Sequence, residues 1–491
     1  MHKKRRKQLK TLALQVTNMY KFASKQIKFS DFNQPLGLTM NPNNRWIKKA
    51  NIIPWDEIEK NYANLFKAKN GQVAKPLRLA LGALLIQIEY GYSDEETTSQ
   101  IQENPYLQFF CGMGGYEDKI PFDPSLMVHF RKRLTPEIIS KINEMVIAKA
   151  QEQSSSKKDD EGKNDPPKNS GTMIVDATCA PSNIKYPQDT ELLNEAREKL
   201  EKMIEVLHDP SDGKKPRTYP QKARKDYLAI ARKKKRSAQA IRKAVRKQLQ
   251  YIKRDLRYID ILLQNGKVPA RKFTVPLQTI RKLYEQQLYM YKSKTHKVAD
   301  RIVNLREPYL RPIVRGKAKS PVEFGTKLDI SVVDGFTRLE KQSFDAYNES
   351  ELLKEELENY RKRYGFYPER VLADKIYRNR NNLNFCKEQG IRLSGPALGR
   401  PKKDAVLDKK QEYVDICERV EVERKFILAK RKFGLGLIRT YLQETTKTVI
   451  ALSILALNLS KVFCAQFWGL IVTWLQLIIF ANGHEKRATV Q

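Results

Sequence analysis

The chain has 491 residues and carries 92 Lys and Arg against 56 Asp and Glu, a net charge of +36. Its content of 41% hydrophobic and 30% charged residues excludes a disordered chain, and its length predicts two to four domains. Such a cationic excess predicts a polyanionic partner, because each Lys or Arg on a phosphate releases counterions. The five cysteines are scattered without a CxxC pair, which excludes a disulfide framework and indicates a reducing, cytoplasmic compartment.

The first part of the chain predicts a basic arm followed by a helical module. Residues 1–70 form the arm and an N-terminal extension, with no apolar segment that would make a secretory signal. Residues 71–150 are predicted to be an α-helical domain, in which Ser93 and Glu96 are spaced as a capping box. A helix-turn-helix reader of DNA is one interpretation of such a module, although helical patterning alone is weak evidence for it.

A polar linker separates this module from a predicted α/β domain. Residues 151–170 contain no large apolar residue, whereas strand and helix signals alternate over 171–445. The first strand is expected to end at Asp176, and a later one leads into Asp374. Carboxylates at strand ends are placed at the rim of the sheet, where α/β domains have their sites. Asp334, by contrast, belongs to a DG pair that is explained by a hairpin turn.

A helical insertion interrupts this domain at about 190–320. Its apolar residues recur at heptad spacing, which predicts a helical hairpin or a three-helix unit. Residues 214–257 hold 18 Lys and Arg against two Asp, too lopsided for self-neutralising i,i+4 pairs. Phosphate contact is therefore favoured over a solvated helix face. The candidate phosphate-binding residues are Lys233, Lys234, Lys235, Arg236, Arg242, Lys243, Arg246 and Lys247.

A helix near the end of the domain contains the stretch ERVEVERKF, with three glutamates in six positions. Arg419, Glu423 and Lys430 stand at i, i+4 and i+11, hence on one helix face. Glu421 lies about 200° from Glu423 around the axis, so the two cannot serve one site. Glu418 is also off this face. Glu423 is thus the predicted third carboxylate beside the two strand-end aspartates.

These segments together resemble the bacterial insertion-sequence transposases of the DDE class, in the branch related to insertion sequence five. The stretches MIVDAT and VLADKIYRNR are similar to the surroundings of that family's first and second aspartates. Arg419, Glu423 and Lys430 match three of four positions of its third motif, Tyr-x2-Arg-x3-Glu-x6-Lys. Ile416 stands at the tyrosine position, with Tyr413 one turn earlier. Residues 76–146, notably FDPSLMVHFRKRL, resemble the family's helical N-terminal domain.

The resemblance implies an α/β fold: an RNase H-like catalytic core with a long, basic α-helical insertion, preceded by an α-helical N-terminal domain. It implies that Asp176, Asp374 and Glu423 are catalytic and hold two Mg²⁺ ions, for which Mn²⁺ would substitute. Arg419 and Lys430 would contact DNA phosphates. Metal chemistry agrees, because Mg²⁺ prefers hard oxygen ligands and a pair of ions stabilises the entering and leaving oxygens of phosphoryl transfer.

The implied function is metal-dependent DNA cleavage and strand transfer of an insertion sequence. Its partners would be double-stranded DNA, as terminal inverted repeats and target, and a second copy of the chain. A catalytically inactive DNA-binding accessory or repressor, and an RNase H-like nuclease without strand transfer, are the alternatives. No HExxH or GxxxxGK[ST] motif indicates a zinc hydrolase or an ATPase. Tyr377 as a recombinase nucleophile is less favoured than metal binding by Asp374.

The C-terminal segment, residues 446–491, predicts apolar helices and a tail. Val462–Phe480 is 19 residues without a charge, close to the length that spans a bilayer. It contains Gln466, Thr473 and Gln476, and a second apolar run precedes it at Val449–Leu459. A pair of buried helices or an oligomer contact is therefore favoured over a membrane segment.

Overall fold

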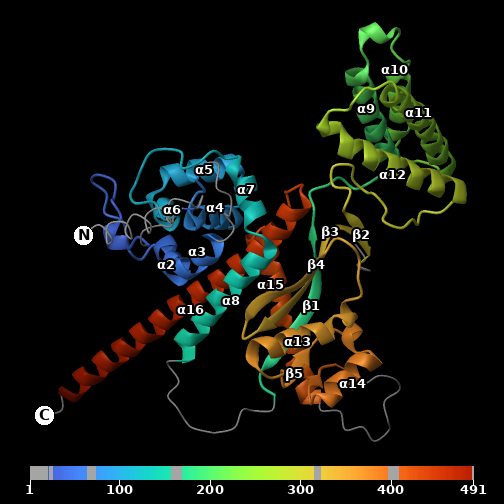
Figure 1. Ribbon diagram of the computed structural model, residues 1–491. Coiled ribbons are helices and arrows are strands. Elements are labelled where there is room, and N and C mark those ends of the chain that lie inside the picture. The colour runs from blue at the N-terminus through green and yellow to red at the C-terminus, as the bar shows by residue number, and fades with distance from the viewer. Residues whose placement is uncertain are drawn as a thin grey trace, which may run out of the picture.

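The computed structural model describes residues 20, 26–63, 73–155, 169–314, 322–395 and 409–488. The basic arm before residue 20 and most of the polar linker lie outside these residues. A mixed α/β fold is confirmed, with a helical N-terminal region, a central sheet and a helical insertion that stands apart from both (Figure 1).

The N-terminal region is built from short helices joined by tight turns. Gly91, at φ 72°, ends one helix in the left-handed conformation, and Ser93 Oγ accepts a hydrogen bond from Glu96 N at 3.0 Å to begin the next. The helices are α2 Arg45–Ile52, α3 Trp55–Ala63, α4 Leu77–Tyr90, α5 Asp94–Glu103, α6 Pro105–Phe110, α7 Leu126–Arg133 and α8 Pro136–Ser155.

One hydrophobic core unites this region, and it begins well before residue 71. Trp46 of α2 and Trp55 of α3 are buried against Phe110 of α6, in the core that also contains the apolar residues of α4. The expected boundary at residue 70 therefore does not separate two packing units.

The C-terminal segment is one helix, α16 Gln443–Ala488, rather than the expected pair. Only Ser460 and Lys461 separate its two apolar runs, so no Pro or Gly breaks the helix there. Gln443–Ala465 is long and apolar enough to cross a membrane, but 72% of its apolar window is buried inside the protein. That part packs against α8, α4, α7 and the strand β4 Phe336–Ser343, and it belongs to the N-terminal core. Most side chains of Val462–Phe480 lie outside the described residues.

The sheet has the strand order β2-β3-β1-β5-β6, with β4 also pairing with β3. β1 pairs antiparallel with β3, which pairs antiparallel with β2 and β4, whereas β1, β5 and β6 are parallel. The Asp334–Gly335 hairpin turn is confirmed, because both residues have the positive φ of a type I′ turn. The strands are β1 Thr172–Pro181, β2 Arg311–Val314, β3 Val322–Val333, β4 Phe336–Ser343, β5 Arg370–Leu372 and β6 Arg392–Leu393.

The first strand does not end at Asp176, as expected, but continues to Pro181. The reason is its antiparallel partner: β3 pairs with β1 from Met173 to Pro181, although the parallel pairing with β5 stops at Ile174. Asp176 therefore lies in mid-strand, at the point where one edge of β1 becomes free of β5.

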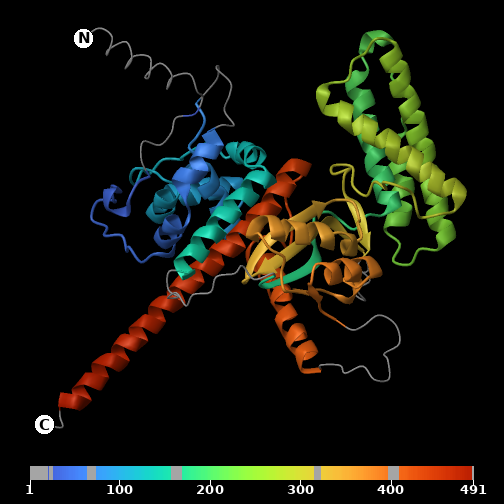
Figure 2. The same cartoon turned by 60° about the horizontal axis from the view of Figure 1, so that its bottom comes forward.

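Helices cover the two faces of the sheet differently. Met173, Val175 and Val371 face the core formed with α13 Leu353–Tyr364 and α14 Arg380–Glu388. Ile174 and Leu372, on the opposite face, pack against α15 Lys409–Lys432. Figure 2 shows α15 leaving the sheet with one end projecting from it.

The insertion is a four-helix unit, larger than the predicted hairpin or three-helix unit. Its apolar heptad residues, including Leu200 and Ile252, are buried in a core of their own. The range predicted for the insertion, about 190–320, also includes β2, which belongs to the sheet because it pairs with β3. The helices of the insertion therefore end before residue 320. The helices are α9 Asp189–Leu207, α10 Pro220–Ala231, α11 Ala238–Gln264 and α12 Arg271–Ser293.

Candidate active site and nucleic-acid interface

The parallel pairing of β1 with β5 brings the two predicted aspartates together. Ile174 and Leu372 are the last pair in register, and Asp176 and Asp374 each follow two residues later. Because side chains alternate along extended chain, both carboxylates lie on the face of Ile174 and Leu372, the face that α15 covers.

Asp176 occupies a shielded position at the centre of this arrangement. Its Oδ1 accepts a hydrogen bond from Ala177 N at 2.8 Å, and its Oδ2 lies 4.0 Å from Arg419 Nη1. Burial raises the pKa of Asp176 to about 6, with smaller upward contributions from Glu349 and Asp374 that Arg419 and the Ala177 hydrogen bond oppose. Asp176 thus bears a charge that its surroundings only partly compensate.

Asp374 sits just beyond the end of β5 and is exposed. It is the N-cap of a single 3-10 turn, η4 Lys375–Tyr377, and its Oδ1 accepts a hydrogen bond from Lys375 N at 2.6 Å. Its carboxylate is therefore accessible from solvent while its backbone is fixed by the turn.

The third carboxylate is brought to the aspartates by the docking of α15. Val422, fully buried, packs against Ile174 and Leu372, and Asp415 binds Arg392 of β6 through two contacts of 2.7 Å. These contacts fasten the helix to the same sheet face as Asp176 and Asp374.

The exposed face of α15 carries the predicted stripe. Arg419 Nη2 lies 3.4 Å from Glu423 Oε1, and the same guanidinium approaches Asp176. Arg419 therefore bridges Asp176 and Glu423. Lys430 lies half-buried farther along the helix, and Ile416, at the position where the resemblance implies tyrosine, is 61% exposed.

The other two glutamates of the ERVEVERKF stretch face elsewhere. Glu418 Oε2 is 2.7 Å from Arg370 Nη2, and Glu421 Oε1 is 3.8 Å from Lys425 Nζ. Both line a cavity beside the Asp334–Gly335 turn, together with Lys461 of α16. Glu421 thus lies on the far side of α15 from Glu423, at the angle that helical geometry predicts.

Two known protein families match separate parts of the chain, one in the N-terminal region and one in the C-terminal part of the α/β domain. Residues 37–133 match a family model described as a transposase domain, and residues 371–460, which include Asp374, Arg419 and Glu423, match one described as a transposase DDE domain. This pairing is typical of transposases related to insertion sequence five. Over these two segments the chain resembles the DDE-class transposases.

Comparisons with a curated relative and with solved structures give less information about the family than these two matches do. The chain is 27% identical over 169 residues to a Rhizobium meliloti protein named "Uncharacterized protein ORF8 in nfe locus", a match that covers 34% of this chain and 77% of that protein. No solved structure matches the chain.

The three carboxylates suit a hard divalent cation in kind, since all three donors are carboxylate oxygens and Asp176, whose side chain is 20% exposed, carries an incompletely compensated charge. Among the described residues, however, no three Asp, Glu, His or Cys side chains are close enough to hold a metal together. Arg419 lies between Asp176 and Glu423 instead. The donor set therefore fits a divalent cation in kind, but to hold one the three carboxylates would have to come closer together and the Arg419 side chain would have to move aside.

The predicted basic surface of the insertion divides into two groups. Lys233, Lys234 and Lys235, between α10 and α11, and Lys243 and Arg246 on α11 are exposed. The remaining three candidates have intramolecular partners: Arg236 donates to Gln188 Oε1 at 2.6 Å, Lys247 donates to Asp226 Oδ1 at 2.6 Å, and the Arg242 guanidinium lies 4.1 Å from the centre of the Tyr291 ring.

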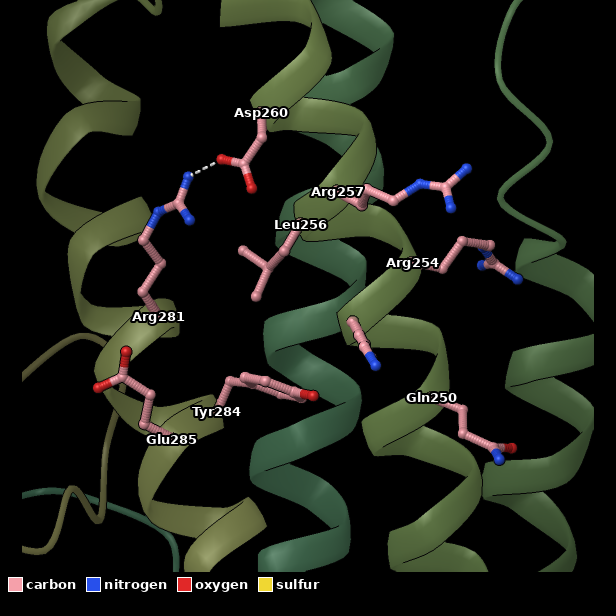
Figure 3. Close-up of a pocket in the computed structure, with 9 residues that line it drawn as sticks. Gln250, Arg254, Leu256, Arg257, Asp260, Arg281, Tyr284 and Glu285 are labelled. Atoms are coloured by element: carbon pink, nitrogen blue, oxygen red, sulfur yellow. Dashed lines mark hydrogen bonds and ion pairs between the residues drawn. The ribbon is translucent and has the colours of Figure 1, made fainter.

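A groove between α11 and α12 was not predicted from the sequence. Figure 3 shows Arg281 of α12 reaching across it to Asp260 of α11, whereas the side chains of Arg254 and Arg257 extend from α11 on the side away from Arg281. The heptad pattern of α11 identifies the buried stripe of that helix, but the position of α12 depends on tertiary packing. The groove extends the basic character of the insertion beyond residues 233–247.

Asp176→Asn should make the metal-free protein more stable at pH 8, by about 1–3 kcal/mol. The folded pKa of about 6 lies above the ordinary value of 3.8, so the folded state binds this proton more tightly and loses stability as pH rises from about 4 to about 6. The difference between Asp176→Asn and wild type should be constant above pH 6 and shrink as pH falls towards 4.

Urea unfolding in EDTA across this pH range measures the difference. Glu423→Gln is the matched control, because that side chain is half exposed and its substitution should change stability little. An Asp176→Asn variant no more stable than wild type at pH 8 would contradict the described burial of this carboxylate.

Proposed function

We propose that this chain is an active transposase, which cuts DNA at the ends of its own insertion sequence and joins the freed 3′ ends to target DNA. The observation that carries this proposal is the arrangement of Asp176, Asp374 and Glu423 around the end of the β1–β5 pair, with Arg419 among them. A degenerate, inactive accessory protein would have no reason to retain all three carboxylates on one face of the sheet.

We further propose that the catalytic domain is RNase H-like. Three antiparallel strands, β4, β3 and β1, followed by the parallel strands β5 and β6, support this assignment. So does the placement of the carboxylates at the first strand, at the end of the first parallel partner and on a covering helix. The basic helical insertion then interrupts the domain between its first and second core strands.

Asp176, Asp374 and Glu423 would hold two Mg²⁺ ions, or Mn²⁺ in their place, in the cytoplasm of a bacterial cell. When bound, such a pair supplies Lewis acidity at the attacking and leaving oxygens of an in-line phosphoryl displacement. The chain's own residues bind and orient the DNA: Arg419 and Lys430, on the face of Glu423, would contact phosphates flanking the scissile bond. Arg419 would exchange its carboxylate contacts for phosphate contacts when DNA arrives.

No covalent protein–DNA intermediate is required by this proposal. Tyr377, considered above as a recombinase nucleophile, is fully buried, and its hydroxyl donates to Asp329 Oδ1 at 3.3 Å. Burial raises the pKa of Tyr377 far above its ordinary value, which opposes formation of a phenolate. Attack by water, and then by the 3′-OH, is the chemistry that suits the remaining groups.

Double-stranded DNA is the proposed partner, both as the terminal inverted repeats of the element and as the target. The exposed cations Lys233, Lys234, Lys235, Lys243 and Arg246 would track the phosphate backbone outside the active site. Two copies of the chain would bring two DNA ends together in the active complex.

Asp176→Asn, Asp374→Asn and Glu423→Gln should each reduce Mg²⁺-dependent cleavage of a DNA carrying the element's end by at least about 1,000-fold, since each removes several kcal/mol of transition-state stabilisation. DNA binding in EDTA should remain. Gel assays of nicking and strand joining measure both steps.

Glu421→Gln is the matched control in the same helix and should retain wild-type cleavage, because Glu421 faces the cavity on the other side of α15. Near-wild-type cleavage by Glu423→Gln would refute the third assignment. Wild-type protein that binds but never cleaves DNA with Mg²⁺ or Mn²⁺ would favour the accessory or repressor function, and cleavage without joining would favour a nuclease.

Replacing the five exposed cations Lys233, Lys234, Lys235, Lys243 and Arg246 by Gln should weaken DNA binding. The slope of log K against log salt should flatten by about 1 for every DNA phosphate that the variant no longer neutralises. Fluorescence anisotropy at several salt concentrations measures this slope. Lys247→Gln is the control, because Asp226 already neutralises that ammonium group; an equally weakened affinity in Lys247→Gln would argue against the described surface.

A further inference from the structure

Two carboxyl groups, Asp329 of β3 and Glu356 of α13, are buried beneath the catalytic face of the sheet. Asp329 is 0% exposed and Glu356 is 2% exposed, and each lies in the electrostatic field of the other. Lys327, the nearest cation in β3, donates instead to Tyr347 O at 2.8 Å and Glu349 Oε1 at 3.2 Å. The proposed function uses neither Asp329 nor Glu356.

Burying two carboxyl groups side by side costs free energy unless hydrogen bonds or opposite charges compensate for the lost water. Apart from the hydrogen bond that the two carboxyl groups share, Asp329 Oδ2 and both oxygens of Glu356 have no partner among the described residues, and an uncompensated buried carboxylate costs several kcal/mol. Burial raises the pKa of Asp329 to about 7, and burial together with Asp329 raises that of Glu356 well above its ordinary value. Burial therefore favours a proton shared between the two carboxyl groups, and replacing such a buried pair by apolar side chains is often neutral or stabilising.

Tyr377 connects this buried pair with the rest of the candidate site. The Tyr377 hydroxyl donates to Asp329 Oδ1 at 3.3 Å, and the Tyr377 backbone N donates to Asp374 O at 3.0 Å. Tyr377 is the last residue of η4, the single turn that begins at Asp374. An isolated 3-10 turn of three residues has little stability of its own, so its position depends on how its end is held.

The strand pairing links this anchor to the other aspartate. Asp329 is the cross-strand partner of Ala177, and Asp176 is the partner of Ile330, the next residue of β3. Asp329 and Asp176 therefore point to opposite faces of the sheet from adjacent positions. Two features thus fix the distance between Asp176 and Asp374. One is the β1–β5 register, and the other is the Asp329–Tyr377 contact on the opposite face of the sheet.

We propose that Tyr377, held by the buried Asp329–Glu356 pair, is a positioning residue that fixes Asp374 relative to Asp176 from beneath the sheet. This inference rests on the proposed function, because Asp374 matters only if it is a metal ligand. Side chains that orient ligands from behind commonly change metal affinity 10–100-fold when they are removed.

Tyr377→Phe tests the proposal by removing only the hydroxyl. The Mg²⁺ concentration for half-maximal cleavage should rise about tenfold, while DNA affinity in EDTA is unchanged. Mn²⁺ binding by the DNA-free protein, followed by calorimetry, should weaken by a similar factor. Tyr360→Phe is the matched control: Tyr360 is buried in the same core and its hydroxyl donates to Ser170 O at 2.8 Å, but it has no link to Asp374.

Substitutions of Asp329 separate positioning from general stability. Asp329→Asn keeps an acceptor oxygen for Tyr377 and should be close to wild type, whereas Asp329→Ala should reproduce the Tyr377→Phe effect. The double variant Asp329→Ala/Tyr377→Phe should be no worse than either single one, because both remove the same contact. A Tyr377→Phe metal requirement equal to that of Tyr360→Phe would overturn the proposal, and full activity of Asp374→Asn would instead overturn the proposed function.

Discussion

The geometry of the candidate site depends on three residue pairs of a parallel ladder, Thr172 with Arg370, Met173 with Val371 and Ile174 with Leu372. Because of this register, Asp176 and Asp374 each follow the last pair of the ladder by two residues, and their side chains lie on the same face of the sheet. A slip of one residue would turn one of them to the opposite face, into the core of α13 and α14. The same ladder positions the third carboxylate, because Val422 of α15 packs on Ile174 and Leu372.

The rest of the molecule holds this short ladder in place. Antiparallel pairing with β3 extends β1 well past the ladder, and the β3–β4 hairpin is tied to the N-terminal core. Asn458 of α16 donates to Thr337 O at 2.7 Å and accepts from Thr337 N at 2.9 Å, while Arg338 is paired with Glu144 of α8. The sheet lies between a helical region fixed to one side and the basic insertion on the other (Figure 1).

Local sequence patterns predicted the parts of the site that depend on local geometry. Helical periodicity separated Glu423 from Glu421, and the DG pair explained Asp334 without a chemical role. The resemblance to DDE transposases added the pairing of Asp176 with Asp374. The roles of these carboxylates stay predictions, because they concern chemistry rather than position.

Features that depend on tertiary contacts were missed or misplaced. The strand at Asp176 was expected to end there, since nothing local reveals that β3 pairs with its second half. Asp329 looks in sequence like a polar residue on the solvent side of a strand, and only the packing of α13 shows that it is buried beside Glu356. Likewise, the hydrogen-bond partners of Arg236 and Lys247, Gln188 and Asp226, come from other segments of the chain.

The most direct test of the central claim, that Asp176, Asp374 and Glu423 share one metal site, is affinity cleavage of the polypeptide. Fe²⁺ placed in a Mg²⁺ site generates hydroxyl radicals with ascorbate and peroxide, and these cut the backbone beside the bound ion. The account predicts three cuts, near residues 176, 374 and 423, all suppressed by excess Mg²⁺. Cuts confined to other acidic positions, such as Asp260 and Glu285 in the groove of the insertion, or cuts that Mg²⁺ does not suppress, would contradict it.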